Sequence, residues 1–213
     1  MNTTHHARPL IPVLVALLIA SVVVGCGQSG SESQLGRDPY LGEVGESTVF
    51  TGRFVGNDRH EGEAVALLEI KEIHYQVSEL ISSEGRSIAF KEFSAGDVVP
   101  ALTDVPLARD TDYVFTTTRW AIGTDNEAFA VWSVYDADTM DPVGDFIQHP
   151  TPAEMLLPGR SGTAARLTAL VDFLSEVTER KQAPRRGEDP GPPSEQLVHA
   201  LAAIGQTPAE PPM

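Results

Sequence analysis

The apolar positions of this chain follow three different patterns. Residues 10–24 form an almost unbroken apolar run. Between residues 47 and 147, short apolar runs alternate with Gly, Asp and Pro, which is typical of β-strands joined by turns. From Thr163 to Lys181, apolar residues recur every three or four positions, as in an amphipathic helix. The pattern predicts a mainly β body, a small antiparallel barrel or sandwich, with a packed C-terminal helix; an α+β fold is the alternative.

Five segments of the body carry the signals of strands. In the first of them, Phe50 and Phe54 point to the core and residues 56–58 end the strand. Residues 63–81 are ambiguous, because residues 64–75 fit a strand with a bulge while later apolar residues fall at helical spacing. A strand is favoured there because the neighbouring segments are strands. The five segments are residues 47–55, 87–93, 113–120, 129–135 and 143–147, and a turn at residues 94–97 leads to residues 98–100.

The C-terminal part is expected to hold two helices separated by a linker. Residues 182–193 are rich in Pro and charge, which is typical of a linker. Ser194 is a predicted N-cap of a short helix that reaches Ile204 and then docks or frays, since ten residues are marginal alone. Residues 182–213 are therefore predicted as linker, short helix and disordered tail, after one globular domain over residues 47–181. The long helix has one apolar stripe of Leu167, Leu170, Val171, Leu174 and Val177, and the short one a stripe of Val198, Leu201 and Ile204.

The apolar run at residues 10–24 has the layout of a secretory signal. Arg8 precedes it, and Gly25 and Cys26, the only cysteine, follow it. A membrane-spanning helix is the rival interpretation. Fifteen residues reach only about 22 Å, however, which is short of the roughly 30 Å hydrocarbon core. The sequence thus favours a signal peptide over residues 1–25.

The end of this run, Val23-Val24-Gly25-Cys26, resembles the lipobox of bacterial lipoproteins. The resemblance implies that signal peptidase II recognises Val23, Val24 and Gly25 and cuts before Cys26. It also implies an S-diacylglycerol on the Cys26 thiol, with acyl chains such as palmitate, and a possible N-acyl group. Two or more chains hold a protein stably in a bilayer. The resemblance therefore places the protein on the extracytoplasmic side of the bacterial cell membrane, with residues 26–46 as a flexible tether.

Charge narrows the choice of partners. Residues 1–25 hold one Arg and no acid, so the remainder carries 14 basic and 30 acidic side chains, a formal charge of −16. Such a body repels nucleic acid and anionic headgroups, so no nucleic acid is expected and membrane contact runs through the lipid on Cys26. Once Cys26 is lipidated, no thiol remains for a disulfide, a metal or a nucleophile. No cofactor is predicted.

The order of the predicted strands resembles a second class of proteins. A glycine-marked first strand, the Gly96-Asp97 turn, the strand over residues 113–120, an aromatic hairpin and a helix follow one another. This order is similar to that of bacterial secreted proteins with an oligonucleotide/oligosaccharide-binding (OB) barrel, a fold shared by netrin-like domains and tissue inhibitors of metalloproteinases. The resemblance covers residues 47–180. Those inhibitors use a free amino-terminal cysteine and several disulfides, which this chain lacks, so inhibition is not implied.

Candidate chemistry is sparse. Asp136, Asp138, Asp141 and Asp145 form the tightest acid cluster and are weak candidates for a cation site, with a hairpin loop as the favoured interpretation. Tyr113, Trp120, Trp132 and Tyr135 are candidates to line a ligand groove, although such residues are more often core. The histidines are far apart and lack paired metal spacing. The sequence holds neither a Gly-x-Ser-x-Gly elbow nor a phosphate-binding glycine loop, and no catalytic residue is assigned.

Two functions remain open at this point. A lipid-anchored, non-enzymatic binding or interaction module of the cell envelope, with an envelope protein or a glycan as partner, is favoured by the anchor, the tether and the lack of a catalytic constellation. The alternative is an envelope hydrolase or glycan-acting enzyme whose carboxylates, such as Asp136 or Asp138 with a distant Glu, converge only in the fold.

Overall fold

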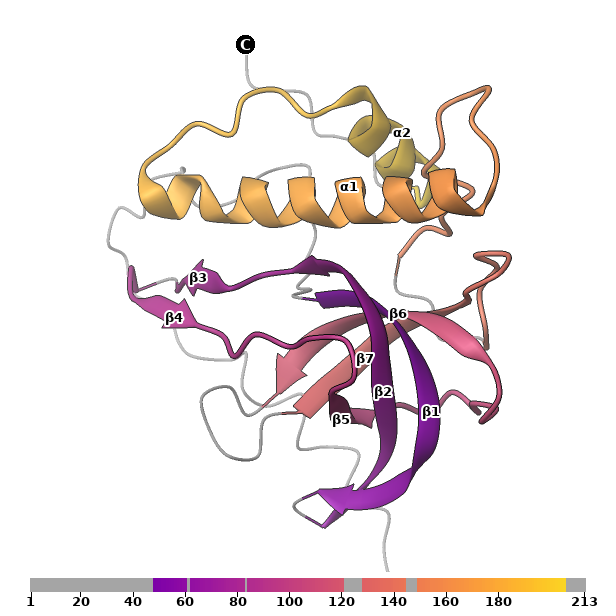
Figure 1. The fold of residues 1–213 in the computed structure, drawn as a ribbon. Helices are drawn as coiled ribbons and strands as arrows, with labels where there is room; N and C mark the ends of the chain where they lie inside the picture. Colours follow the sequence, from indigo (N-terminus) through magenta and orange to yellow (C-terminus); the bar gives the residue numbers. More distant parts are fainter. Residues whose placement is uncertain (1–47, 61, 83, 121–127, 145–148, 206–213) are drawn as a thin grey trace, which may run out of the picture. The chain divides into compact units, whose positions relative to one another are not determined.

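The structure is a computed structural model that describes residues 48–60, 62–82, 84–120, 128–144 and 149–205. Five strands form a closed barrel in the order β1-β2-β5-β7-β6 (Figure 1). Neighbouring strands are antiparallel, except that β5 and β7 run parallel. The predicted mainly β fold with a packed C-terminal helix is confirmed, although the barrel is mixed rather than purely antiparallel. The barrel strands are β1 (Thr48–His60), β2 (Glu63–Gln76), β5 (Val98–Leu102), β6 (Asp112–Trp120) and β7 (Ala128–Asp136).

The ambiguous segment at residues 63–81 is extended, as favoured, but it is divided into β2 and the short strand β3 (Glu79–Ile81). Only β2 pairs with β1, through an irregular register. Lys71 and His74 are extra residues on β2, and Val55 is an extra residue on β1. Bulges of this kind bend a strand and increase its twist, which lets a long pair wrap around a barrel. They also let β1 continue to His60, beyond residues 56–58, where the sequence had predicted its end.

The inside of the barrel is a packed aromatic core. The ring of Phe50 lies 5.2 Å from that of Phe115 and 5.5 Å from that of Phe129, measured between centroids. Phe50 is fully buried, as its alternation predicts, and Phe54 is partly buried against the same core. Side chains rather than open space therefore fill the barrel. The remaining buried members of this core are Ala66, Leu68, Ile70, Val99, Ala101, Val105, Tyr113, Val131 and Val134.

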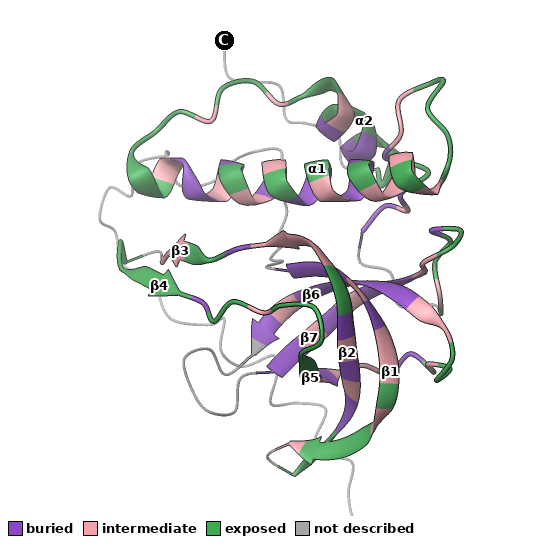
Figure 2. Cartoon of the chain, in the orientation of Figure 1, coloured by how far each residue is buried: buried purple, intermediate pink, exposed green. Residues whose placement is uncertain are grey.

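A second core lies between the outside of the barrel and helix α1 (Thr163–Gln182), as the burial pattern in Figure 2 shows. Val49, Val114 and Tyr135 supply the barrel side of this layer. The helix begins and ends within one residue of its predicted bounds. Its predicted stripe faces this layer: Leu170, Leu174 and Val177 are buried, and Leu167 and Val171 are partly buried. None of the described helices is long and apolar enough to cross a membrane.

Helix α2 (Glu195–Ala203) docks on the same layer. The Ser194 hydroxyl accepts a hydrogen bond from the Leu197 backbone N at 3.0 Å, so the predicted N-cap is present. The buried face consists of Leu197, Ala200 and Leu201. Val198 and Ile204, predicted to lie on the apolar side, are exposed. The three buried residues also have i, i+3, i+4 spacing, and that stripe is the one that meets the core.

The segment between the two helices contains a short 3-10 helix, η2 (Pro184–Arg186). Gln182 and Ala183, at the start of the segment expected to be a linker, are buried. Farther along, the buried Arg180 side chain donates to the Gly191 carbonyl at 3.0 Å. These contacts hold the beginning and the end of the segment against α1.

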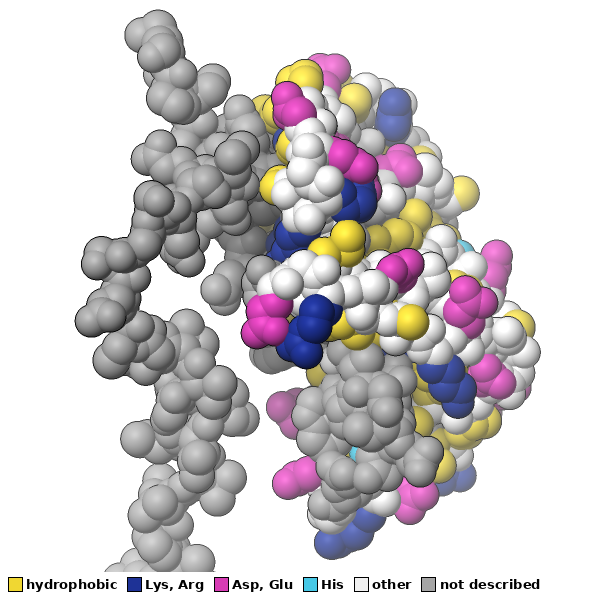
Figure 3. All heavy atoms as spheres, turned by 90° about the vertical axis from the view of Figure 1, so that its left-hand side faces the viewer, with side chains coloured by type: hydrophobic (Ala, Val, Ile, Leu, Met, Phe, Trp, Pro, Cys, Tyr) yellow, Lys and Arg dark blue, Asp and Glu magenta, His cyan; other side chains and the backbone are white. Residues whose placement is uncertain are grey.

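Two short strands, β3 (Glu79–Ile81) and β4 (Ser87–Ala89), pair beside the barrel. Figure 3 shows this side of the molecule, where acidic and basic side chains are interspersed with apolar ones. The strand predicted over residues 87–93 ends at Ala89, because the chain then turns in toward Arg119. That guanidinium lies 4.7 Å from the Phe93 ring centroid and 5.2 Å from that of Phe90, and it donates to the Lys91 carbonyl.

The predicted return strand over residues 143–147 is only partly described. Pro142 forms an isolated bridge with Tyr135, and the Val143 backbone N donates to the Val134 carbonyl at 2.8 Å. Residues 145–148 lie outside the described residues.

Candidate functional site

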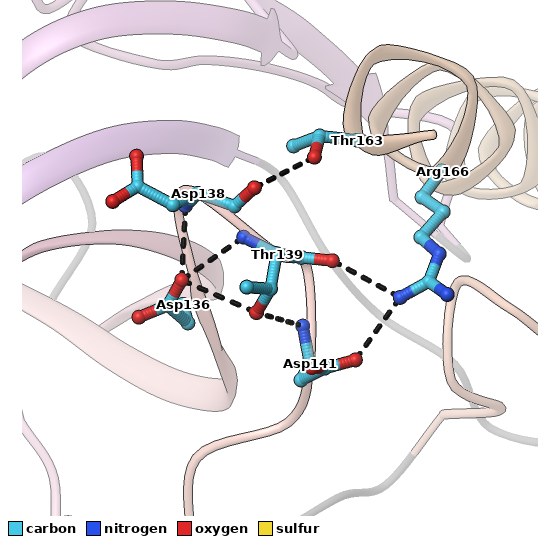
Figure 4. A network of polar contacts seen from close by, with 6 residues as sticks. All are labelled: Asp136, Asp138, Thr139, Asp141, Thr163 and Arg166. Atoms are coloured by element: carbon cyan, nitrogen blue, oxygen red, sulfur yellow. Dashed lines mark hydrogen bonds and ion pairs between the residues drawn. The ribbon is translucent and has the colours of Figure 1, made fainter. Parts of the chain in front are cut away.

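The acid cluster forms a turn that is tied to α1 (Figure 4). Asp136 Oδ1 accepts hydrogen bonds from the backbone N of Asp138 and of Thr139, both at 3.0 Å, and from the Thr139 hydroxyl at 3.2 Å. Arg166 of the helix donates to the Thr139 carbonyl and to Asp141 Oδ1, each at 3.0 Å. The polar groups of this cluster therefore hold the turn together and attach it to the helix.

This arrangement bears on the candidate cation site and on the carboxylate alternative. Among the described residues, no group of three or more His, Cys, Asp or Glu side chains is arranged to hold a metal ion. Asp138 uses its backbone carbonyl to accept from the Thr163 hydroxyl at 2.6 Å. Asp145 lies outside the described residues. Asp136, one of the two acids that the enzyme alternative offered as examples, accepts its hydrogen bonds within its own turn.

The aromatic candidates do not gather at one surface. Tyr113 belongs to the barrel core, and its hydroxyl accepts from the Ala108 backbone N at 3.0 Å. Tyr135 is fully buried in the layer beneath α1. Trp132 is half-buried and stacks on His149 with centroids 6.0 Å apart. The side chain of Trp120 is not described. Tyr113 and Tyr135 thus belong to two different cores instead of lining one groove.

The structure instead brings polar side chains together on the outer face of β6, β1 and β2. The strand register places Asp112 beside Arg53 and Arg53 beside Glu69, in one row across the three strands. The adjacent residues Phe54, Leu68, Ile70 and Tyr113 belong to the barrel core or pack against it, so by strand alternation these three side chains point outward. Arg53 forms two hydrogen bonds with Asp112, at 2.7 and 3.0 Å, and these raise the pKa of Arg53. Lys71 pairs with Glu69 at 2.7 Å.

His74 stands beside this row at a bulge of β2. Its Nε2 lies 2.7 Å from the Thr51 hydroxyl, and its Nδ1 lies 3.9 Å from a carboxylate oxygen of Glu72. Burial lowers the pKa of His74, while the nearby Glu72 charge opposes that shift. A half-buried histidine with a perturbed pKa, next to a hydroxyl and a carboxylate, is a candidate site residue on physical grounds. Neutral imidazole can donate and accept one hydrogen bond each, which suits polar ligand groups.

An apolar patch continues the outer face onto β5. Leu67 pairs with Pro100, Val98 pairs with Glu69, and the bulged Val55 lies next to the Gly56–Leu67 pair. Val98 is 53 % exposed and Val55 is 38 % exposed, so both are large apolar side chains that lie on the surface. We call Val55, Leu67, Val98 and Pro100 the outer patch. Together with the charged row, it offers apolar and charged contacts on a single sheet face.

The sequence pattern does not predict this face. His74 has no paired histidine or other metal-ligand spacing, and residues 63–81 fit a strand or a helix. The residues of the face come from four strands, and the bulges shift their register, so sequence spacing alone does not bring them together. One feature of the sequence does indicate an outward polar face: Thr51 and Arg53 alternate along the strand with Phe50, Gly52 and Phe54.

Comparison of the chain with protein families, curated proteins and solved structures gave no match.

Proposed function

We propose that this protein is a bacterial lipoprotein, anchored through lipid on Cys26, whose barrel acts as a non-enzymatic binding module of the cell envelope. The observation that carries the proposal is the Val23-Val24-Gly25-Cys26 motif after an apolar run of signal-peptide length. On this proposal the mature chain begins at Cys26 and the tether separates the body from the extracytoplasmic face of the membrane.

The arrangement of the body supports binding rather than catalysis. The barrel interior is filled by Phe50, Phe115 and Phe129, so a partner would have to bind outside it. We further propose that the barrel is of the OB type. The closed five-strand order, with one parallel pair, supports this assignment. OB barrels bind their ligands on an outer sheet face and its adjoining loops, which favours the face that carries the outer patch and the charged row.

Intact mass spectrometry of the protein extracted from bacterial membranes tests the anchor. The wild-type chain should begin at Cys26 and carry the mass of a diacylglyceryl group, with or without an additional acyl chain. Cys26→Ala should abolish both the lipid mass and retention in the membrane fraction. Ser29→Ala, three residues further along, should preserve both. An unlipidated wild-type chain that retains residues 1–25 would contradict the proposal.

A further inference from the structure

The outer patch is flanked by more acid than base. Glu69 pairs with Val98 in the strand register, and the exposed Asp97 precedes Val98 in the chain. Asp112 and the exposed Glu72 lie farther along the face. Two cations stand among these four carboxylates, Arg53 and Lys71, and each is already paired with one of them. The surroundings of the patch are therefore net negative, as is the body as a whole.

Two carboxylates are available to a partner, Asp97 beside Val98 and Glu72 farther along the same face. Glu72 is 72 % exposed, and its oxygen lies 3.9 Å from a histidine whose pKa burial lowers. Asp97 is exposed and accepts a hydrogen bond from the Ser94 backbone N at 2.9 Å, which leaves further acceptor sites on its carboxylate. Carboxylates around an apolar centre attract cationic groups and reject anionic ones, and they act mainly on association rate and specificity.

Building on the proposed binding function, we propose that the outer patch docks a basic segment of a partner protein. An apolar side chain of that segment packs over Leu67, between Val55 and Val98, and flanking Lys or Arg side chains face Asp97 and Glu72. The patch is small, so the contact is of the weak, transient class. The charge of the patch surroundings excludes an acidic partner.

Methyl NMR of the detergent-extracted full-length protein tests this surface with a defined probe. The probe is the peptide Lys-Val-Lys-Val-Lys, and Lys-Gly-Lys-Gly-Lys is its control with equal charge. The first peptide should shift the methyl signals of Val55, Leu67 and Val98 and leave that of Val198 in place, because Val198 lies exposed on α2. Val98→Asn should weaken binding roughly fivefold, as expected for losing part of one Val burial, whereas Val198→Asn should not.

Several outcomes separate the possibilities. Shifts spread over the whole surface, or equal binding of the Gly peptide, would mean general attraction to an acidic protein and would overturn the docking site. Unchanged signals from the buried Leu68 and Ile70 in free Val98→Asn show that the variant is folded, so that unaltered binding by this variant counts against the patch. If Cys26 carries lipid but the peptide does not shift the methyl signals of the patch, only the docking site is rejected. If the peptide shifts those signals but Cys26 carries no lipid, only the anchor is rejected.

Discussion

The Thr51 hydroxyl on β1 lies 2.7 Å from His74 Nε2 on β2, which joins two strands at the point where their register slips. His74 is the residue that the Val49–Tyr75 and Phe50–Ile73 pairs leave unmatched. A bulge leaves its extra residue outside the regular ladder. The side-chain hydrogen bond therefore links β1 and β2 where the ladder is interrupted.

The burial of His74 predicts that the folded protein loses stability as the pH falls. Burial lowers the pKa of folded His74 below the unfolded value of about 6.5, so the unfolded chain binds the proton first as the pH falls. The free energy of unfolding should therefore decrease as the pH drops below about 6.5 and through the folded pKa. Urea unfolding between pH 7 and pH 5 should show this decrease in the wild type and a smaller one in His74→Gln.

A matched histidine provides the control for that experiment. His199 is exposed on α2, so His199→Gln should keep the wild-type dependence on pH. If the free energy of unfolding depends on pH equally in the wild type and in His74→Gln, the burial of His74 is not linked to folding.

Gly52 predicts a steric effect in the same strand. A Cβ at this position would lie 2.8 Å from Phe50 Cε2 and 3.0 Å from the Glu69 carbonyl oxygen. Because the carbonyl belongs to the paired β2 backbone, Gly52→Ala should destabilise the fold by about 1–3 kcal/mol. Gly56 has no such neighbour within 4 Å, so Gly56→Ala should change the free energy of unfolding by less than about 0.5 kcal/mol. Chemical denaturation of both variants measures the difference, and equal losses would refute this account of Gly52.

Local patterns predicted the elements better than their arrangement. The alternation around Phe50 and the stripe of Leu170 and Leu174 each identified an element and its buried face. Residues 63–81 were ambiguous because the bulges at Lys71 and His74 move apolar residues out of strict alternation. On α2, Leu201 is buried as predicted, but Val198 and Ile204 are exposed, because two stripes of similar spacing share Leu201 and only docking selects one.

The candidate site depended on contacts that a linear sequence does not display. Tyr113 and Tyr135 had the residue type of a ligand groove, but strand register directs one into the barrel and the other toward α1. The outward row of Asp112, Arg53 and Glu69 is set by the pairing of β6 with β1 and of β1 with β2. Long-range pairing of this kind cannot be deduced from spacing along one strand.

Two neighbouring threonines of β6 predict opposite responses to the same substitution. Both are fully buried, but Thr117 Oγ1 donates to the Thr48 carbonyl at 3.1 Å, whereas Thr116 Oγ1 has no hydrogen-bond partner among the described residues. Thr117→Val should therefore cost about 1 kcal/mol, and Thr116→Val should be neutral or stabilise the fold by about 1 kcal/mol. Thermal and urea unfolding measure both changes. A loss in Thr116→Val as large as that in Thr117→Val would show that the Thr116 hydroxyl has a partner in solution.

Tyr135 predicts a loss of stability at high pH. Burial beneath α1 raises the pKa of its hydroxyl to about 12, partly opposed by the Ser133 side chain. Between pH 10 and pH 12 the unfolded chain therefore releases this proton while the folded chain keeps it. The free energy of unfolding should fall over that range by about 2 kcal/mol from this group alone.

The contribution of Tyr135 is isolated by comparing two phenylalanine variants. Tyr135→Phe should lose this part of the decrease in the free energy of unfolding at high pH, because phenylalanine has no hydroxyl proton to release. Tyr113→Phe should retain it, because Tyr135 is still present. Urea unfolding at pH 9, 10, 11 and 12, with tyrosinate absorbance as a second readout, measures both. The groups common to both variants cancel in the difference, which sets the Tyr135 hydroxyl against the Tyr113 hydroxyl. If the two variants lose stability in parallel, the Tyr135 hydroxyl is in contact with water in the folded protein, and the layer beneath α1 is open at that point.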